Sequence, residues 1–230
     1  MPDGATSQED ISTITCSEGQ HISKELKAGE HFHHFGDVTI RGDVPLFAQL
    51  TVTDGNVIIT GDVHLESKIS LEHKPRSRLN IKDPYTLMIK GCVCGGKINT
   101  TASNVVICGC MNNQTKVETV SGNIQCLEVM DSFMKTVSGD ISINQKLQNT
   151  KVNTVSGNID ASEISQSDVK TMSGDIVSDG NITSSIISTI SGDIEYASSV
   201  ESFVSTIIGQ TVENESDVNS SGSTTKIEFI

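Results

Sequence analysis

Four cysteines in the middle of the chain have the clearest potential for chemistry. They form two Cys-x-Cys pairs separated by thirteen residues, Cys92 with Cys94 and Cys108 with Cys110. Thiolates bind zinc, but the usual motif has two residues between its cysteines. Alternate residues of a strand also lie about 6.6 Å apart, which is awkward for short metal bonds. Three interpretations follow: inert thiols, a metal site at these four residues, or a redox or cross-linking role.

A short basic stretch is the second candidate, because loops on rigid folds often carry recognition. Residues 64–97 have a formal charge of +4, whereas residues 1–63 have −7 and residues 98–230 have −10. The sequence HKPRSR concentrates this charge, and the residues we expect to bind a partner are His73, Lys74, Arg76 and Arg78. Such a loop can meet an acidic protein, a phosphate or an anionic membrane surface. The alternative is a solvated loop.

The elements that would position these residues follow from a repeated phrase. Copies of Thr-Val-Ser-Gly-Asp/Asn-Ile begin at Thr119, Thr136 and Thr154, and copies with Met or Ile in place of Val begin at Thr171 and Thr189. The glycines from Gly122 to Gly209 are 17 or 18 residues apart. A short regular period is typical of repeat arrays. We therefore expect one stacked unit per copy.

Strand alternation predicts which side chains of the phrase form the core. Alternate residues of a strand share a face, so Val137, Gly139 and Ile141 should point inward. Thr136, Ser138 and Asp140 should then point outward. A rung of this length makes about three short strands, and rungs should stack about 4.8 Å apart with Ile above Ile. The predicted fold class is all-β, a single-stranded parallel β-helix (β-solenoid) with about 17–19 residues per rung.

The first half of the chain continues this period less regularly. GDV and related phrases at Gly36, Gly42, Gly61, Gly91 and Gly109 extend the array to roughly ten or more rungs. The 13 residues from Gly109 to Gly122 predict a shortened turn. We expect an N-terminal cap at 1–30, a solenoid at 31–211 with an inserted loop near 66–86, and a C-terminal cap strand at 212–230.

Composition excludes several classes of function. The formal charge of −13 argues against nucleic-acid binding, which needs a basic surface. The sequence contains no run of about 20 apolar residues, so we expect no transmembrane segment. The N-terminus lacks the plan of a secretory signal, so we expect a cytoplasmic protein with reduced thiols, or one exported without a cleavable signal. We expect no catalytic residue, no cofactor and no enzymatic activity, because no catalytic motif is present.

Stacking places the polar residues of the phrase in columns. The third column alternates Asn and Asp at residues 123, 140, 158, 175 and 193, which separates like charges and favours a structural role. Asp175 and Asp193 are adjacent without an intervening Asn, so a bound cation such as Ca²⁺ is an alternative there. A flat Thr-x-Ser surface that binds ordered water is another.

The TVSGDI and TVSGNI copies resemble the adhesin type of short-rung bacterial β-solenoid. The GDVTIRGDV and GNVIITGDV half is similar to the polymer-forming bactofilins and to the FapA flagellar-assembly family. The resemblance covers about residues 36 to 209. It implies a β-solenoid and supplies no catalytic motif to transfer.

Two functional hypotheses follow. The first is a rigid, non-enzymatic scaffold that binds a protein partner, or a second copy of itself in a homo-oligomer. The second is a module that binds a metal, a glycan or an anionic lipid through the cysteines or the basic loop. Exposed solenoid ends present unpaired strands, so the non-repeating termini should act as covers and favour a monomer or small oligomer over a filament.

Overall fold

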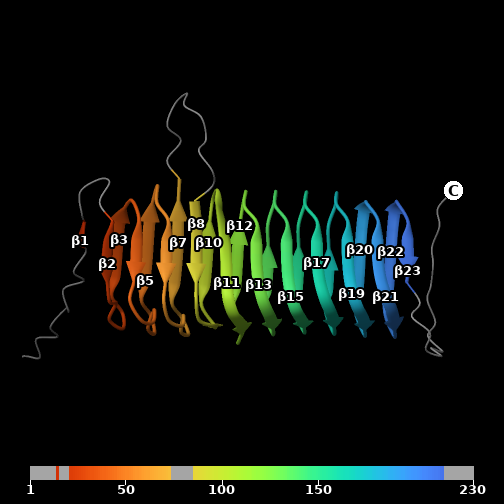
Figure 1. Cartoon of the computed structure of the whole chain (residues 1–230), viewed down its shortest axis with the longest axis horizontal. Helices are drawn as coiled ribbons and strands as arrows, with labels where there is room; N and C mark the ends of the chain where they lie inside the picture. The colour runs from red at the N-terminus through yellow and green to blue at the C-terminus, as the bar shows by residue number, and fades with distance from the viewer. Residues whose placement is uncertain (1–13, 16–20, 74–84, 215–230) are drawn as a thin grey trace, which may run out of the picture.

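The computed structural model is a straight rod of stacked coils, and it describes residues 14–15, 21–73 and 85–214. The strands lie side by side across the rod, from the N-terminal coils at one end to the C-terminal coils at the other (Figure 1). All strand pairings are parallel, and the described residues contain no helix. The predicted fold is confirmed, since the chain is a β-solenoid of about ten turns. None of the described residues forms a helix with the length and apolarity that crossing a membrane requires.

The strands belong to two long sheets. The first sheet contains, in spatial order, β1 (Ile14–Thr15), β3 (His31–Phe35), β5 (Gln49–Thr53), β7 (Lys68–Glu72), β10 (Lys97–Thr100), β12 (Lys116–Thr119), β14 (Phe133–Lys135), β16 (Lys151–Asn153), β18 (Asp168–Lys170), β20 (Ile186–Ser191) and β22 (Phe203–Ile208). The second contains β2 (Ile22–Lys24), β4 (Val38–Ile40), β6 (Val57–Ile59), β8 (Tyr85–Ile89), β11 (Ser103–Asn112), β13 (Ile124–Met130), β15 (Ile141–Gln148), β17 (Ile159–Ser165), β19 (Ile176–Thr183), β21 (Ile194–Val200) and β23 (Thr211–Glu213). Strand β9 (Val93–Cys94) pairs with β11.

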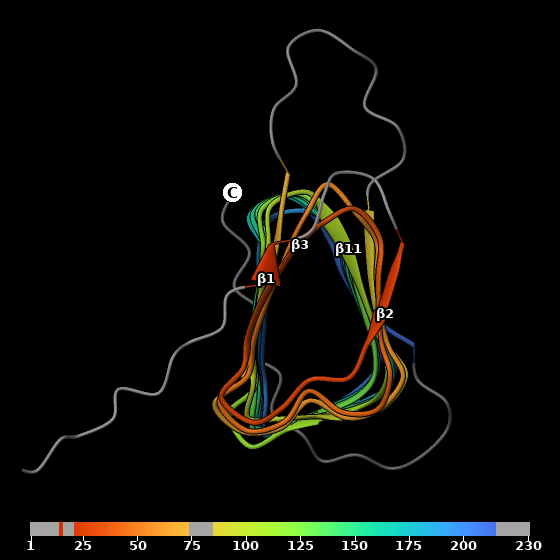
Figure 2. The ribbon, with the colours of Figure 1, turned by 90° about the vertical axis from the view of Figure 1, so that its left-hand side faces the viewer.

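Seen along the rod, the coils superpose on one outline, with the two sheets on opposite sides (Figure 2). In the second sheet Ile141 pairs with Ile124 on one side and Ile159 on the other, as predicted. All three are fully buried. The core is thus a stack of aliphatic side chains along the rod axis, and branched residues suit it because they pack well against their neighbours on a pleated surface.

The chain turns a corner inside each repeated phrase, and the predicted facing of two positions was wrong. Thr136 is buried rather than outward, and Val137 is 40% exposed rather than inward. Isolated bridges such as Ser138 to Ser156 link the rungs here, between the end of β14 and the start of β15. Alternation holds only within a continuous strand, so it restarts after the corner, where Ile141 faces inward as predicted. Buried threonines cannot form the water-binding surface.

The Asn and Asp column at this corner joins one rung to the next. The Asn158 backbone N–H donates to Asp140 Oδ1 at 2.8 Å, and the Asp175 N–H donates to Asn158 Oδ1 at 2.9 Å. The Asp193 N–H donates to Asp175 Oδ1 in the same way, at 2.8 Å. A side-chain oxygen therefore satisfies a backbone N–H that the corner removes from the sheet. This supports the structural interpretation of the column.

Glycines occupy two different corners of the coil. The predicted shortened turn between Gly109 and Gly122 was wrong, because these two glycines lie at different corners. A Cβ on Gly109 would lie 2.6 Å from the Gly91 carbonyl oxygen. A Cβ on Gly122 would instead lie 2.2 Å from the carbonyl oxygen of Ser103. Gly109 and Gly122 therefore belong to separate columns, and the short distance between them in sequence is the distance between two corners of the coil.

A third corner contains buried hydroxyl groups. The preceding residues take a left-handed conformation, with φ of 47° at Asn149 and 50° at Gln166. The Thr150 N–H donates to Ser167 Oγ at 3.1 Å, and Ser167 Oγ donates to the Ser165 carbonyl oxygen at 2.7 Å. The hydroxyl thus links one rung to its neighbour and closes its own turn. Small hydroxylated residues suit this position because both bonds are made inside the coil.

The boundaries differ from the predicted ones where the structure describes them. Strand β2 pairs with β4, so the stack includes Ile22 and does not begin at residue 31. Strand β7 occupies 68–72, inside the predicted loop near 66–86, and residues 74–84 lie outside the described residues. Strand β23 pairs with β21, and the rest of the predicted C-terminal cap, 215–230, also lies outside them.

Replacement of Thr154 by valine is expected to stabilise the protein. The Thr154 hydroxyl is buried and has no hydrogen-bond partner among the described residues, whereas the Thr189 hydroxyl donates to the Gly174 carbonyl oxygen at 3.1 Å. An unsatisfied buried polar group is costly, so Thr154→Val should raise the free energy of unfolding by about 1 kcal/mol. Thr189→Val is the matched control and should lower it. Urea denaturation measures both, and equal changes in the two variants would contradict the assignment.

Candidate functional site

A line of exposed apolar side chains runs along the corner that follows the first sheet. We call it the apolar ridge, and its residues are between 39% and 59% exposed: Val120, Val137, Val155, Met172, Ile190 and Ile207. Each comes from a different rung, and the serine bridges beside them fix the rungs in register. At about 4.8 Å per rung the ridge is about 24 Å long. Single exposed apolar residues are ordinary, but a contiguous line of them marks an interaction surface.

Charged residues flank the apolar ridge on both sides. Lys135 lies two residues before Val137 in the first sheet, and Asp140 lies three residues after it, beyond the corner; both are exposed. The Met172 rung repeats the arrangement with Lys170 and Asp175. At these two rungs the ridge therefore has a basic border on the sheet side and an acidic border on the corner side, whereas the Val120 rung has Glu118 on the sheet side and Asn123 on the corner side.

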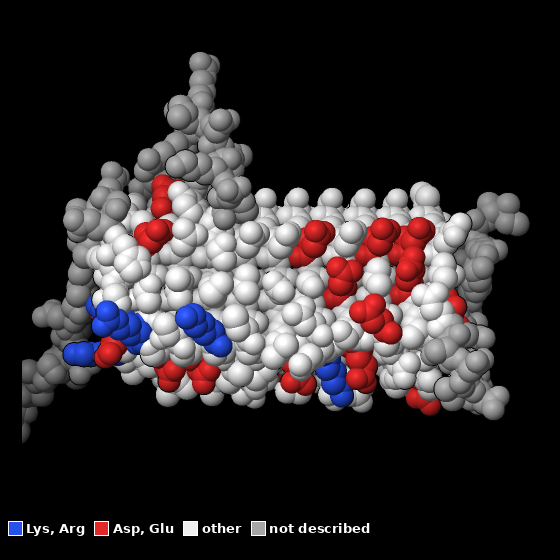
Figure 3. Space-filling view, viewed as in Figure 1, with Lys and Arg blue, Asp and Glu red and all other residues white. Residues whose placement is uncertain are grey.

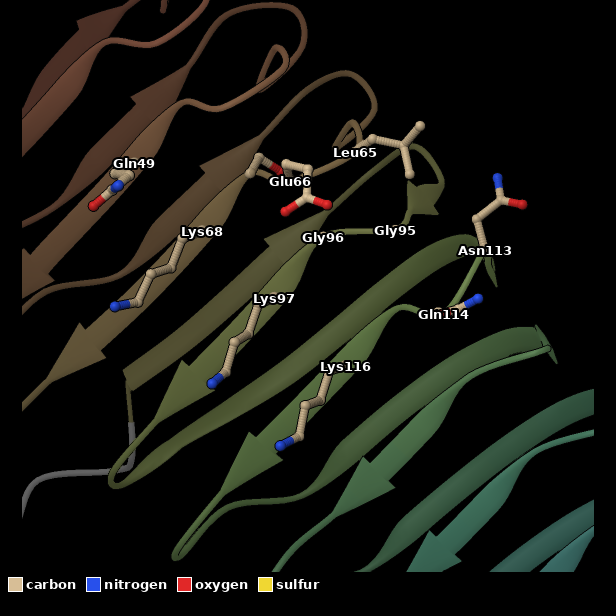
Figure 4. Close-up of a pocket in the computed structure, with 11 residues that line it drawn as sticks. Gln49, Leu65, Glu66, Lys68, Gly95, Gly96, Lys97, Asn113, Gln114 and Lys116 are labelled. Atoms are coloured by element: carbon tan, nitrogen blue, oxygen red, sulfur yellow. The ribbon is translucent and has the colours of Figure 1, made fainter.

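A second surface feature is an open groove of about 720 Å³ beside strands β7, β10 and β12. Lys68, Lys97 and Lys116 line it, one from each strand, and the pairing of these strands places the three in register. Figure 4 shows their side chains extending in the same direction from neighbouring strands. Glu66 and Gly95, each two residues before the lysine of its own rung, also line the groove. We call the three residues the lysine column.

Two of these lysines share one carboxylate. Glu118 lies 3.0 Å from Lys116 Nζ and 4.0 Å from Lys97 Nζ. Lys116 Nζ also lies 5.3 Å from the centroid of the Phe133 ring. Lys68 makes no ion pair with any residue in the described part of the chain. These three lysines belong to a protein with a net negative charge. Figure 3 shows acidic side chains gathered over the rungs near the C-terminal end of one long face.

The cysteines are brought together only in part. The Cys110 thiol lies 2.8 Å from Cys92 Sγ on the neighbouring rung, as the stacking of Gly91 and Gly109 predicts. Cys108 is exposed. Among the described residues, no group of three or more His, Cys, Asp or Glu side chains could hold a metal ion. The structure therefore places Cys92 and Cys110 in contact but does not assemble the four cysteines as metal ligands.

Cys92 also has a structural partner. The Asp62 N–H donates to Asp43 Oδ1 at 2.8 Å, and the Cys92 N–H donates to Asp62 Oδ1 at 2.7 Å. The Cys110 N–H then donates to Cys92 Sγ at 3.1 Å. The sulfur of Cys92 thus takes the place of an aspartate oxygen in a second column of rung-to-rung bonds.

Alkylation at neutral pH is expected to separate the cysteines by environment. Burial, and then the neighbouring Cys92 sulfur, raise the pKa of Cys110 to about 12, and burial raises the pKa of Cys126 to about 12. Because the thiolate is the nucleophile, both should resist iodoacetamide at pH 7, whereas the exposed Cys108 should react first. Mass spectrometry of the labelled protein measures this, with urea-unfolded protein as the control. Labelling of Cys126 as fast as Cys108 would contradict the described burial.

These raised pKa values also link to stability. A thiol whose folded-state pKa lies above its usual value of 9.0 favours the folded state while it is protonated. The contribution of Cys126 is therefore complete below about pH 9 and is lost as the pH rises through about 12.

The predicted basic loop is described only at its start. His73 Nδ1 lies 2.9 Å from Asp54 Oδ1, and its ring lies 5.8 Å from the ring of Tyr85. The other three predicted partner-binding residues, Lys74, Arg76 and Arg78, lie outside the described residues. His73 therefore fastens the end of β7 to the neighbouring rung and to β8.

Sequence reasoning missed both surface features, for different reasons. The apolar ridge was assigned to the core because the corner was not recognised. The lysine column was missed because 29 residues separate Lys68 from Lys97 and only 19 separate Lys97 from Lys116. The sequence carries no signal for the ridge, because the burial of the threonines and the exposure of the valines beside them follow from a turn that only the structure shows.

The geometry defines the class of protein by itself: the chain is a parallel β-solenoid with an apolar ridge along one corner and a lysine column on one sheet. Comparison with protein-family models, with curated proteins and with solved structures found no match.

Proposed function

We propose that this protein is a rigid, non-enzymatic scaffold that binds a protein partner along the apolar ridge, either another protein or a second copy of itself. The observation that carries the proposal is the line of six exposed apolar side chains held in register by the coil. Burying an apolar surface is the main favourable term in most protein associations. A rigid support also lowers the cost of association, because few groups must be ordered on binding.

The structural use of the polar groups supports a scaffold rather than an enzyme. Asp140 and Asp175 accept backbone N–H groups from the following rungs, and the hydroxyls of Ser167 and Ser185 are bonded inside the coil. These groups hold rungs together. The likeness of the SGDI phrases to adhesin-type solenoids agrees with a role in adhesion or assembly.

A differential capture experiment tests the proposal. The protein is immobilised as wild type, as the ridge variant Val155→Glu, and as the control Ile58→Glu, whose position on the second sheet is also exposed. Proteins from an extract of the source cells that are retained by wild type and control, and lost from the ridge variant, are expected. Retention by all three forms alike would contradict the proposal.

Binding of an anionic ligand at the lysine column is the second candidate function. Three in-register ammonium groups on successive rungs suit a linear polyanion with a short repeat, and Lys68 has no ion-pair partner among the described residues. Fluorescence titration with polyphosphate should show affinity that falls with added salt. Lys68→Gln with Lys97→Gln should weaken it at least tenfold, whereas Lys146→Gln, away from the groove, should not. Unchanged affinity in the double variant would exclude this site.

A further inference from the structure

We propose that the partner of the apolar ridge is a second copy of this chain, packed beside the first with parallel coil axes related by a twofold axis along the rod. This inference rests on the proposed function, since it assigns an occupant to the same ridge. It adds the identity of the partner and the orientation of the complex. The period of the ridge and the residues that border it indicate both.

A second copy matches the ridge in length and in period. The ridge residues of one copy are spaced by the rung rise of about 4.8 Å, and only a partner with the same rise can contact every one of them equally. A twofold axis makes this contact closed, because the same patch serves on both copies. The complex is then a dimer rather than a filament.

The charges beside the ridge determine the orientation. A twofold axis parallel to the rod places the basic border of one copy against the acidic border of the other, at the same height. Lys135 then faces the partner's Asp140, and Lys170 faces the partner's Asp175. The intervening rung has Asn153 and Asn158 at these positions, so no like charges meet there.

An antiparallel pair would bring like borders together. A twofold axis across the rod leaves each border on its own side, so that Lys135 and Lys170 of one copy would line the same edge as the partner's Lys135 and the partner's Lys170. Like charges placed face to face are unfavourable. The parallel arrangement is therefore the one that the borders select.

The two kinds of contact have different roles. Exposed ion pairs contribute little to affinity, and Lys170 Nζ already lies 2.8 Å from Asp168 Oδ1 within its own chain. Lys135 makes no ion pair with a described residue of its own chain and is the more informative position. The apolar ridge should supply most of the affinity, and the borders should fix which way the copies point.

Sedimentation velocity over a wide range of protein concentration tests the dimer, with the full chain at neutral pH. Wild type and Ile58→Glu are expected to form a dimer with the same dissociation constant. Val155→Glu should raise that constant at least tenfold. Its circular dichroism and melting temperature show that the coil is intact, and Val155→Ser serves as a milder variant if it is not. A wild type that stays monomeric overturns the inference, and a ridge-dependent partner in the capture experiment would then still support the proposed function.

Charge changes at the border test the orientation separately. Lys135→Glu should weaken the dimer several-fold, because it places a carboxylate opposite the partner's Asp140. Adding Asp140→Asn should restore most of the loss, and asparagine keeps the hydrogen bond to the Asn158 N–H because Asn occupies this column in other rungs. A stronger dimer in Lys135→Glu alone would overturn the parallel arrangement, since it would report the relief of lysine repulsion in an antiparallel pair.

Discussion

Gly157→Ala is expected to destabilise the protein by at least about 3 kcal/mol, although it adds only one methyl group. A Cβ at this position would lie 2.1 Å from the Gly139 carbonyl oxygen and 2.6 Å from the carbonyl carbon. Both atoms belong to the backbone of the preceding rung, so no side chain can move aside. The rungs would have to separate, and the hydrogen bonds on both sides of the corner would lengthen together.

Ser156→Ala is the control for this variant. The serine precedes Gly157 at the same corner, its side chain is exposed, and its backbone rather than its hydroxyl bridges the rungs. We expect a change within about 0.5 kcal/mol. Urea denaturation followed by circular dichroism measures both variants. A Gly157→Ala protein as stable as Ser156→Ala would mean that the rungs are not in contact at this corner.

Ile159→Ala is expected to lower the free energy of unfolding by about 2–5 kcal/mol. Ile159 is fully buried and pairs with Ile141 and Ile176 in the aliphatic stack. Truncation removes buried apolar surface and leaves a cavity between two rungs whose spacing is fixed by backbone hydrogen bonds. Because the rungs cannot collapse onto that cavity, the loss of unfolding free energy should lie near the upper end of this range.

The same substitution at Ile190 separates burial from residue type. Ile190 is 42% exposed on the apolar ridge, one rung beyond Met172. Ile190→Ala should change the stability of the monomer by less than about 1 kcal/mol. Chemical denaturation at a protein concentration below the dissociation constant of any dimer measures both variants. Similar losses in the two would show that the two positions are equally buried, which would contradict the described corner.

The period of the sequence was sufficient to predict the coil and its core. Glycines 17 or 18 residues apart placed Ile141 beside Ile159, because a rung of constant length returns every position to the same side. The period does not show which side chains of a rung point into the core and which point outward. Alternation assigns faces only along a continuous strand, and nothing in TVSGDI indicates that the backbone turns between Val137 and Ile141.

For the same reason, the sequence does not show which corner each glycine of the first half occupies. Gly42, Gly61, Gly91 and Gly109 share one corner, while Gly122 continues the column that passes through Ser103. Both corners have a small residue that is followed in most rungs by Asp or Asn, and at Gly91 and Gly109 by a cysteine, so their phrases look alike. A sequence with two similar corners per rung does not by itself reveal which corner a given phrase occupies.

The candidate surfaces depended on that missing information. The apolar ridge and the lysine column are each made of one residue per rung, and neither is a motif along the chain. The cysteine contact was the exception: Gly91 over Gly109 aligned Cys92 with Cys110 directly. Contacts between equivalent positions of neighbouring rungs can be predicted, whereas exposure depends on where the chain turns.

The bonding between coils makes each one depend only on the coil before it and the coil after it. Strand β15, for example, pairs with β13 and β17 and with no other strand in the described part of the chain. Unfolding that begins at one end should therefore proceed one coil at a time. A destabilising substitution in the middle should divide the rod into two blocks that unfold separately. The two ends of the rod are not in contact, so a conformational change at one end can reach the other only through each intervening coil.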